Sequence, residues 1–373
     1  MKDTVIKGDG TSRTLKAPAS MPETFEEWRS QLLAGNATMD IGLNNDGCTV
    51  VGTAMSKANL LSDTTKEALE LSQSDPTVND ALYALSQKTQ PAELHVLVGS
   101  GIVVTISKGS KVLSATAGSD GWAVLYPAEF GEWTVKATLS GTQVTKTFDV
   151  NAIAVFYMAM ASLEDLDWSV VSSVSEAGLA SKLWNIGDTK TLTVNGVSYV
   201  SQIIGFDHDT KTAGGTAGIT FQLQDMLATT YPMNSSNTNV NGWRGSVMRT
   251  STMATLLSQL PTALQNAIKE VNKVSSVGNN SSGLETTADK LFLLSEIEIF
   301  GATAYSYAGE GKQYAYYAAG NSTVKKKSGS AYNWWERSPL SGDTTDFCRV
   351  TSSGTATNYG ASASGGVSFG FCV

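Results

Sequence analysis

The sequence predicts an α+β fold that is divided among several domains. The chain has 373 residues, and at about 150 residues per domain this length corresponds to two or three domains. The spacing of apolar residues changes from helical to alternating near Ala92, and a mixture of both patterns begins near Trp184. The chain also contains 35 glycines, many of them in turns between short apolar segments. We therefore expect a small helical module, a β-sandwich and a mixed C-terminal domain.

Residues 1–90 are expected to form the small N-terminal helical module. The first 20 residues lack apolar periodicity, which predicts an extended arm. Thr24 and Glu27 then match the spacing of a capping box, so a helix is predicted from there to Gly35. Shorter helices are predicted at 64–71 and 78–85.

Residues 91–151 are expected to form an Ig-like β-sandwich. Leu94, Val96 and Val98 alternate with polar residues, and similar short alternating segments follow at intervals typical of a sandwich. Residues 152–183 are predicted to link this domain to the next one. The linker consists of a buried strand at 153–160 and one amphipathic helix at 163–183.

The C-terminal domain is expected to span residues 184–373. Asn195 and Gly196 lie between two apolar segments, which strongly predicts a β-hairpin. Ser295 and Glu298 match a second capping box and predict the start of a helix. The other predicted elements are a strand at 219–223 and helices at 246–257 and 260–271.

Charge and hydropathy argue against nucleic-acid binding and membrane insertion. The net charge is −8, with 26 basic and 34 acidic side chains. The only basic cluster, Lys325 to Lys327, is interpreted as a solvated turn. No apolar segment approaches the ~18 residues that a membrane span needs, and the N-terminus lacks the apolar segment of a signal peptide. We expect synthesis in the cytoplasm without a signal peptide.

Metal binding is not predicted. Asp207, His208 and Asp209 form the one cluster that resembles a ligand set. Adjacent strand residues point to opposite faces, so at most two of the three side chains would reach one ion. An aspartate-stabilised turn explains this cluster more simply.

Enzymatic activity is not predicted either, and neither is a cofactor. The sequence has no catalytic-triad arrangement, phosphate-binding loop or zinc-protease motif. Glu296 and Glu298 are expected on the outside of a helix or strand. Cys348 and Cys372 follow phenylalanines and are expected to be small buried hydrophobic residues. A disulfide between them in an oxidising medium remains an open alternative.

Residues 331–373 have the most informative composition. Both ends are aromatic, whereas Ser, Thr and Gly account for 14 of the 26 residues from Leu340 to Gly365. Small polar residues between rigid aromatic ones are typical of adaptable binding loops. The alternative is an ordinary Gly/Ser-rich surface hairpin.

Several separated motifs in the C-terminal domain resemble one family. They are Trp184-Asn185-Ile186-Gly187-Asp188, Gly205-Phe206-Asp207-His208-Asp209, Tyr231-Pro232-Met233-Asn234, Trp334-Trp335-Glu336-Arg337-Ser338-Pro339 and Gly370-Phe371-Cys372-Val373. Together they resemble a domain of unknown function found in tail proteins of phages and prophages of gut bacteria. This resemblance implies a C-type lectin-like fold of the formylglycine-generating-enzyme type. The relatives of that domain include the variable proteins of diversity-generating retroelements.

The other two regions also resemble parts of phage proteins. Near the N-terminus, the carriers of the resemblance are residues 1–10, Ser12-Arg13-Thr14-Leu15-Lys16 and Phe25-Glu26-Glu27-Trp28, which are similar to the beginning of phage tail-fibre proteins. The sandwich is similar to the Ig-like or carboxypeptidase-regulatory-like modules that phages insert between such parts. The resemblance implies a tail-attachment module, a spacer and a display head, in that order.

The resemblance implies a variable region at about 334–373, in which some positions diversify and others form the scaffold. The implied ligand-binding and variable positions are Glu336, Leu340, Ser341, Gly342, Asp343, Thr344, Thr345, Asp346, Arg349, Thr351, Ser353, Thr355, Thr357, Asn358, Tyr359, Gly360, Ser362, Ser364 and Gly365. The implied scaffold anchors are Trp334, Trp335, Phe347, Val350, Phe369 and Phe371. The cysteine pair of the family's enzymatic branch is not recognisable in this sequence, so that activity is not implied.

These resemblances imply a receptor-binding protein of a phage or prophage tail. The expected partners are a bacterial cell-surface protein or glycan and other tail proteins, within a homotrimer located in the virion. Two alternatives remain: a structural tail-fibre or baseplate protein with a fixed lectin-like head, and a glycan-active enzyme.

Overall fold

The structure, a computed structural model, describes residues 4–6, 12–14 and 92–373. Near the N-terminus, β1 (Thr4–Ile6) pairs antiparallel with β2 (Ser12–Thr14). The helices predicted at 24–35, 64–71 and 78–85 lie outside the described residues.

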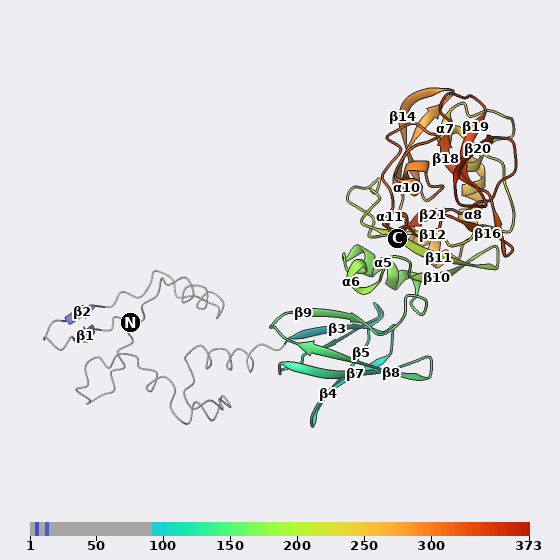
Figure 1. The fold of residues 1–373 in the computed structure, drawn as a ribbon. Helices are drawn as coiled ribbons and strands as arrows, with labels where there is room; N and C mark the ends of the chain where they lie inside the picture. Colours follow the sequence, from blue (N-terminus) through green and yellow to red (C-terminus); the bar gives the residue numbers. More distant parts are fainter. Residues whose placement is uncertain (1–3, 7–11, 15–91) are drawn as a thin grey trace. The chain divides into compact units, whose positions relative to one another are not determined.

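Residues 92–159 form two β-sheets (Figure 1). One sheet has the order β6-β3-β9 and the other has the order β5-β4-β7-β8. Leu94, Val96, Val104 and Ile106 alternate with more exposed residues and are completely buried, so the predicted alternation is present. The strands are β3 (Glu93–Leu97), β4 (Val103–Lys108), β5 (Lys111–Thr116), β6 (Trp122–Leu125), β7 (Gly131–Leu139), β8 (Thr142–Val150) and β9 (Val155–Ala159).

The segment predicted as a buried linker strand is instead an edge strand. β9 pairs in parallel with β3 only, and Val155 at its start is 49% exposed. Its apolar sequence suggested burial on both faces, but an edge strand in a two-layer arrangement has one face open to solvent.

The helix predicted at 163–183 is interrupted. Helix α5 (Trp168–Glu176) ends before Gly178, and the short helix α6 (Ala180–Leu183) follows. Gly178 has a φ of +67°, a conformation that glycine adopts easily and that ends a helix. The apolar residues that suggested an earlier start precede α5 in a loop.

A five-stranded antiparallel sheet organises the C-terminal domain, with the order β10-β11-β12-β21-β15. The predicted hairpin between β10 and β11 is confirmed, since Asn195 and Gly196 both have positive φ. The last strand, β21, lies between two earlier ones, so the end of the described chain is part of the core. The strands are β10 (Thr189–Val194), β11 (Val197–Phe206), β12 (Ile219–Leu223), β15 (Leu291–Phe292) and β21 (Gly370–Cys372).

Short helices and smaller sheets complete this domain. The helix predicted at 246–257 is present as the π-helix η1 (Met248–Met253) and α8 (Ala254–Ser258). The helix predicted at 260–271 is shorter, because the chain turns into a strand at Val271. The remaining elements are α7 (Gly242–Gly245), α9 (Thr262–Ala267), β13 (Val271–Gly278), β14 (Ser281–Asp289), α10 (Glu296–Phe300), α11 (Ala315–Ala318), β16 (Lys325–Lys327), β17 (Ser330–Tyr332), β18 (Trp334–Pro339), β19 (Asp346–Val350) and β20 (Ala356–Gly360).

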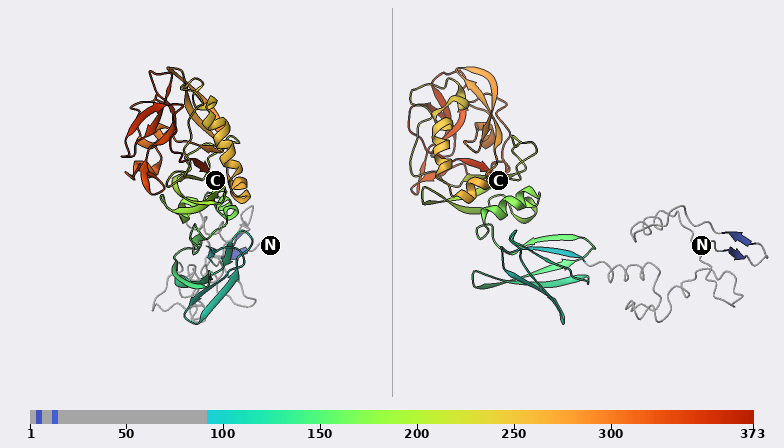
Figure 2. Two further views of the ribbon diagram at one scale, coloured as in Figure 1. Left: turned by 90° about the vertical axis from the view of Figure 1, so that its right-hand side faces the viewer. Right: turned by 180° about the vertical axis from the view of Figure 1, so that it is seen from behind.

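The strand set β18-β19-β20 lies at the end of the C-terminal domain that is opposite α5 and α6 (Figures 1 and 2). Aromatic rings fill the core between these ends. Trp168, Phe221 and Phe371 contact one another with ring centroids 5.3–5.8 Å apart. The fold is therefore β-rich α+β, and none of its described helices has the length and apolar character needed to cross a membrane.

Candidate functional site

Strand β18 provides a rigid base for the loops of residues 340–365. All six of its residues are buried. Trp334 donates its indole N–H to the carbonyl of Thr323 at 3.0 Å, and Trp335 donates to Tyr231 at 2.8 Å. The six expected scaffold anchors are all completely buried: Trp334, Trp335, Phe347, Val350, Phe369 and Phe371.

The expected variable positions lie mainly at the surface. Those that are exposed are Gly342, Thr344, Ser353, Thr355, Tyr359, Ser362 and Ser364. Those that are half-buried are Leu340, Ser341, Asp343, Thr345, Asp346, Arg349, Thr351, Thr357, Asn358 and Gly360. The loops between the anchors thus present small polar groups to solvent.

Two of the expected positions, Glu336 and Gly365, are buried instead. Glu336 lies within β18, both faces of which are covered, so its polarity did not indicate its environment. A Cβ atom at Gly365 would lie 2.5 Å from the indole nitrogen of Trp335. Replacement of Gly365 is therefore incompatible with the present packing of Trp335, and neither residue contributes to the exposed surface.

Glu336 is unusual because neither of its carboxylate oxygens has a hydrogen-bond partner among the described residues. Burial, followed by the nearby charges of Glu296 and Glu310, raises its pKa well above the ordinary value of 4.5. The raised pKa favours the neutral form of this buried side chain within the scaffold strand.

A network of buried charges includes Arg337 of β18 and anchors this strand to neighbouring segments. Arg337 donates to the carboxylate of Glu298 at 2.5 and 2.9 Å and to the backbone carbonyls of Val274, Leu293 and Glu310. The ammonium of Lys273 lies 2.7 Å from both Glu298 and Asp209.

The network keeps its carboxylates ionised. Burial alone would raise the pKa of Glu298, but the charges of Arg337 and Lys273 lower it below its usual range. The pKa of Asp209 is likewise lowered, because Lys273 and hydrogen bonds outweigh the effect of its burial. The charges in this network compensate one another, and the network has a structural role.

The expected exterior location of Glu296 and Glu298 is wrong. Both are buried. Glu298 completes the capping box with Ser295, which is confirmed. Glu296 accepts hydrogen bonds from the backbone N–H groups of Ala304, Tyr305 and Ser306. The partners of Glu296 lie in an irregular segment, and the partner Arg337 of Glu298 lies in a distant strand. The local pattern of charges does not reveal either set of partners.

The interpretation of Lys325 to Lys327 as a solvated turn is wrong, because the three residues form the strand β16 and differ in exposure. Lys325 is buried and donates to the carbonyls of Leu223 at 2.6 Å and Gln224 at 3.1 Å. Lys326 is exposed, and Lys327 is half-buried with its ammonium 4.6 Å from the ring centroid of Tyr332.

The loop of residues 340–346 is held by hydrogen bonds within the loop and by hydrogen bonds from Asn239. The carboxylate of Asp343 accepts from the backbone N–H and hydroxyl of Thr345 and from the N–H of Asp346. Asn239 donates its side-chain amide to the carbonyls of Asp343 at 3.1 Å and Asp346 at 2.9 Å. Asp343 thus orders the loop.

Arg349 in β19 lies on the surface of the sheet β18-β19-β20, against Tyr359 in β20. Its guanidinium carbon is 4.0 Å from the ring centroid of Tyr359, which is 48% exposed. Lys327 and Tyr332, which form a similar contact nearby, were not among the predicted site residues. The available signals in the sequence were the basic run Lys325 to Lys327 and the aromatic residue Tyr332 just before the Trp334–Pro339 motif.

The three residues of the Asp207 cluster point to different surroundings. Asp207 is exposed and adopts a positive φ of 49°. His208 stacks on the ring of Tyr314 with centroids 3.9 Å apart, whereas Asp209 is buried against Lys273. Among the described residues, no group of three or more His, Cys, Asp or Glu is placed to hold a metal ion.

The buried thiols of Cys348 and Cys372 are not bonded to each other.

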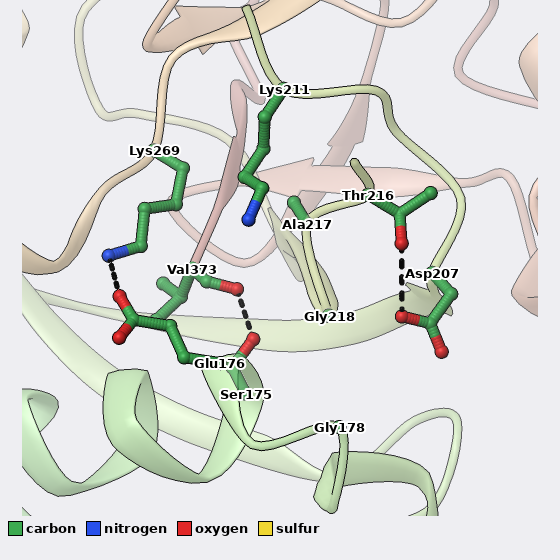
Figure 3. A pocket seen from close by; sticks show the side chains of 10 residues that line it. All are labelled: Ser175, Glu176, Gly178, Asp207, Lys211, Thr216, Ala217, Gly218, Lys269 and Val373. Atoms are coloured by element: carbon green, nitrogen blue, oxygen red, sulfur yellow. Dashed lines mark hydrogen bonds and ion pairs between the residues drawn. The ribbon is translucent and has the colours of Figure 1, made fainter. Parts of the chain in front are cut away.

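A pocket of about 190 Å³ lies beside Asp207 (Figure 3). Two of its lining groups, Glu176 and Lys269, form an ion pair, and Ser175 donates to the carbonyl of Val373 at 2.5 Å. The hydroxyl of Thr216 donates to Asp207 at 3.4 Å. Lys211 lines the pocket as well, so the lining carries both charged and hydroxyl groups.

One comparison with known families gives a match. Residues 217–373 match a family model described as "Domain of unknown function (DUF6273)". The match begins just before β12 and includes β18, the loops of residues 340–365 and the central strand β21. No curated protein matches the chain.

Proposed function

We propose that this protein is a receptor-binding protein of a phage or prophage tail, with a C-type lectin-like head that displays a diversifiable ligand-binding surface. One observation carries the proposal: along 334–365 the anchors are completely buried, whereas most of the residues between and after them are exposed or half-buried and small and polar. This arrangement separates the residues that determine the fold from those that contact a ligand.

The energetic consequences of substitution support this separation. Replacing an exposed residue such as Ser353 or Thr355 changes stability by about 0.5 kcal/mol or less. Truncating a buried anchor such as Trp335 costs about 3–5 kcal/mol. A surface with these properties tolerates many sequences at its loops without losing the fold.

The rest of the proposal follows the order of the domains. The N-terminal module attaches to the tail, the residues 92–159 act as a spacer, and the C-terminal domain binds a bacterial surface protein or glycan. In a homotrimeric fibre, several weak sites combine to give high avidity. In this proposal the head binds its ligand without catalysing a reaction, and the buried charges around Glu298 have a structural role.

The decisive test is to sequence the locus across many phages or cells of one population. We expect adenine-templated changes at codons of exposed positions such as Thr355 and Tyr359, with the anchor codons fixed. The codons of the spacer, 92–159, are the internal control and should not vary. A 334–365 segment as constant as the spacer would refute diversification.

A fixed structural head is the second candidate, and the loop of residues 340–346 favours it. Asp343 and Asn239 together fix this loop with hydrogen bonds, as expected for a surface that packs against a constant partner. Invariance of the locus together with tight association with purified tail proteins would support this candidate.

A further inference from the structure

Two cations and two tyrosines form a cluster on the surface of the C-terminal domain. We call Lys327, Tyr332, Arg349 and Tyr359 the cation–tyrosine cluster. Lys327 contacts the ring of Tyr332 at 4.6 Å, and Arg349 contacts the ring of Tyr359 at 4.0 Å. Tyr332 is also close enough to Arg349 to influence its pKa, which connects the two pairs.

Arg349 differs from every other arginine in residues 92–373. Arg244, Arg249 and Arg337 each form an ion pair with a carboxylate. Arg349 has no such pair within the described part of the chain, and its buried Nε has no hydrogen-bond partner there. Its guanidinium is held in place by the ring of Tyr359, with its capacity to bind a carboxylate or phosphate unused.

Asp346 is close enough to Arg349 to act on it electrostatically. Its carboxylate forms no ion pair with Arg349 in the described part of the chain and accepts from the hydroxyl of Thr345 at 2.7 Å. An external anion is therefore the natural partner for this guanidinium.

The surroundings of Arg349 favour a sugar as the carrier of that anion. Tyr359 is half exposed and offers an aromatic surface against which the C–H groups of a sugar ring pack. Thr357 lies opposite Arg349 in the strand pair, and Thr355 lies two positions before it in the chain. These side chains can hydrogen-bond to sugar hydroxyl groups. A nucleic acid is disfavoured because the chain has a net charge of −8.

We propose that the cation–tyrosine cluster binds an acidic glycan, with Arg349 pairing with its carboxylate or phosphate and Tyr359 packing against the sugar ring. This inference rests on the proposed ligand-binding function of the same surface and specifies its ligand class.

The test measures binding of the full-length protein by isothermal titration calorimetry. The probes are an oligogalacturonate and its methyl ester, and a mannose 6-phosphate oligosaccharide and its dephosphorylated form. We expect at least one acidic glycan to bind about tenfold or more tightly than its neutral counterpart, as is typical for charge-assisted hydrogen bonds. The two arms distinguish a carboxylate from a phosphate as the recognised group.

Variants assign this binding to the cluster. Arg349→Gln and Tyr359→Ala should each weaken it by about tenfold or more, and added salt should weaken it in the wild type. Arg244→Gln removes another exposed arginine, whose partner is Glu285, and should leave binding unchanged. Thermal melting of each variant verifies that the fold is retained.

The result can separate this inference from the proposed function. If no acidic glycan binds better than its neutral form, or if Arg349→Gln binds as well as the wild type, the inference is refuted. Binding of the protein to a panel of bacterial isolates is measured in parallel. Cell binding that does not depend on Arg349 would leave the receptor-binding proposal intact and refute the acidic-glycan site alone.

Discussion

Replacing Glu336 with leucine should stabilise the protein. The carboxyl of Glu336 is completely buried and lacks a hydrogen-bond partner among the described residues, an arrangement that costs about 1–3 kcal/mol. Leucine has a similar volume and removes this cost. We expect the free energy of unfolding at pH 7 to rise by about 2 kcal/mol, which raises the Tm of a domain of this size by about 4–8 °C.

The pH dependence provides a second measure of the same effect. Burial raises the pKa of Glu336 well above 4.5, so the folded protein retains a proton that the unfolded chain releases. The stability that comes with this proton is complete below pH 4.5 and decreases as the pH rises. The advantage of Glu336→Leu should therefore be larger at pH 8 than at pH 5, as measured by calorimetric melting.

Glu296 provides the matched control. It is also completely buried, but its carboxylate accepts backbone hydrogen bonds from Ala304, Tyr305 and Ser306. Glu296→Leu should therefore destabilise the protein by about 1–3 kcal/mol. A destabilised Glu336→Leu variant, or a gain that does not change with pH, would show that Glu336 is satisfied in solution and would refute the reasoning.

Three further predictions concern the scaffold. Burial raises the pKa of Glu310 to about 7 from 4.5. Its contribution to the free energy of unfolding should therefore decrease by about 3 kcal/mol between pH 4.5 and 7. Thermal melts should show this pH dependence in the wild type and its loss in Glu310→Gln. Lys273→Met leaves the carboxylates of Asp209 and Glu298 without their shared cation and should cost about 3–5 kcal/mol in urea unfolding, whereas an unchanged midpoint would contradict a structural role. Gly365→Ala should cost about 1–3 kcal/mol because of the close approach of Trp335, and equal stability in the same assay would show that the loop can move away.

Local patterns predicted the elements that depend on neighbouring residues. The alternation of Leu94 and Val96, the turn at Asn195 and the capping box of Ser295 all involve contacts within a few positions, and all three are present. The helix predicted at 163–183 was too long, because Gly178 allows a left-handed turn that the apolar spacing conceals.

Contacts between distant segments explain most of the differences between prediction and structure. Glu298 was expected at the surface, but its partner Arg337 lies 39 positions away. Lys325 reaches a carbonyl 102 positions away. A charged residue in a sequence is normally read as solvated, and only the three-dimensional arrangement shows that its charge is compensated inside the domain.

The candidate surface was predicted more accurately than its chemistry. Composition indicated small polar segments between aromatic anchors, and residues 340–365 form the strands β19 and β20 with polar loops around them. The unpaired state of Arg349 could not be predicted, because it depends on the nearby Asp346 accepting a hydrogen bond from Thr345 instead.

Strand β18 links the stability of the domain to the tolerance of its surface to substitution. In β18, Trp335 fixes the loop at Gly365, and Arg337 fixes the strand itself through Glu298 and three backbone carbonyls. Arg349 is the cross-strand partner of Trp335, but the hydrogen bonds of Arg337 and Glu298 involve neither Arg349 nor Tyr359. Interactions at sites that share no partners are nearly additive, so changes at the exposed loops should leave the scaffold intact. Measured double-mutant cycles between Glu298 and Tyr359 should therefore give a coupling energy below about 0.5 kcal/mol, and a larger value would show that the surface and the buried network are not independent.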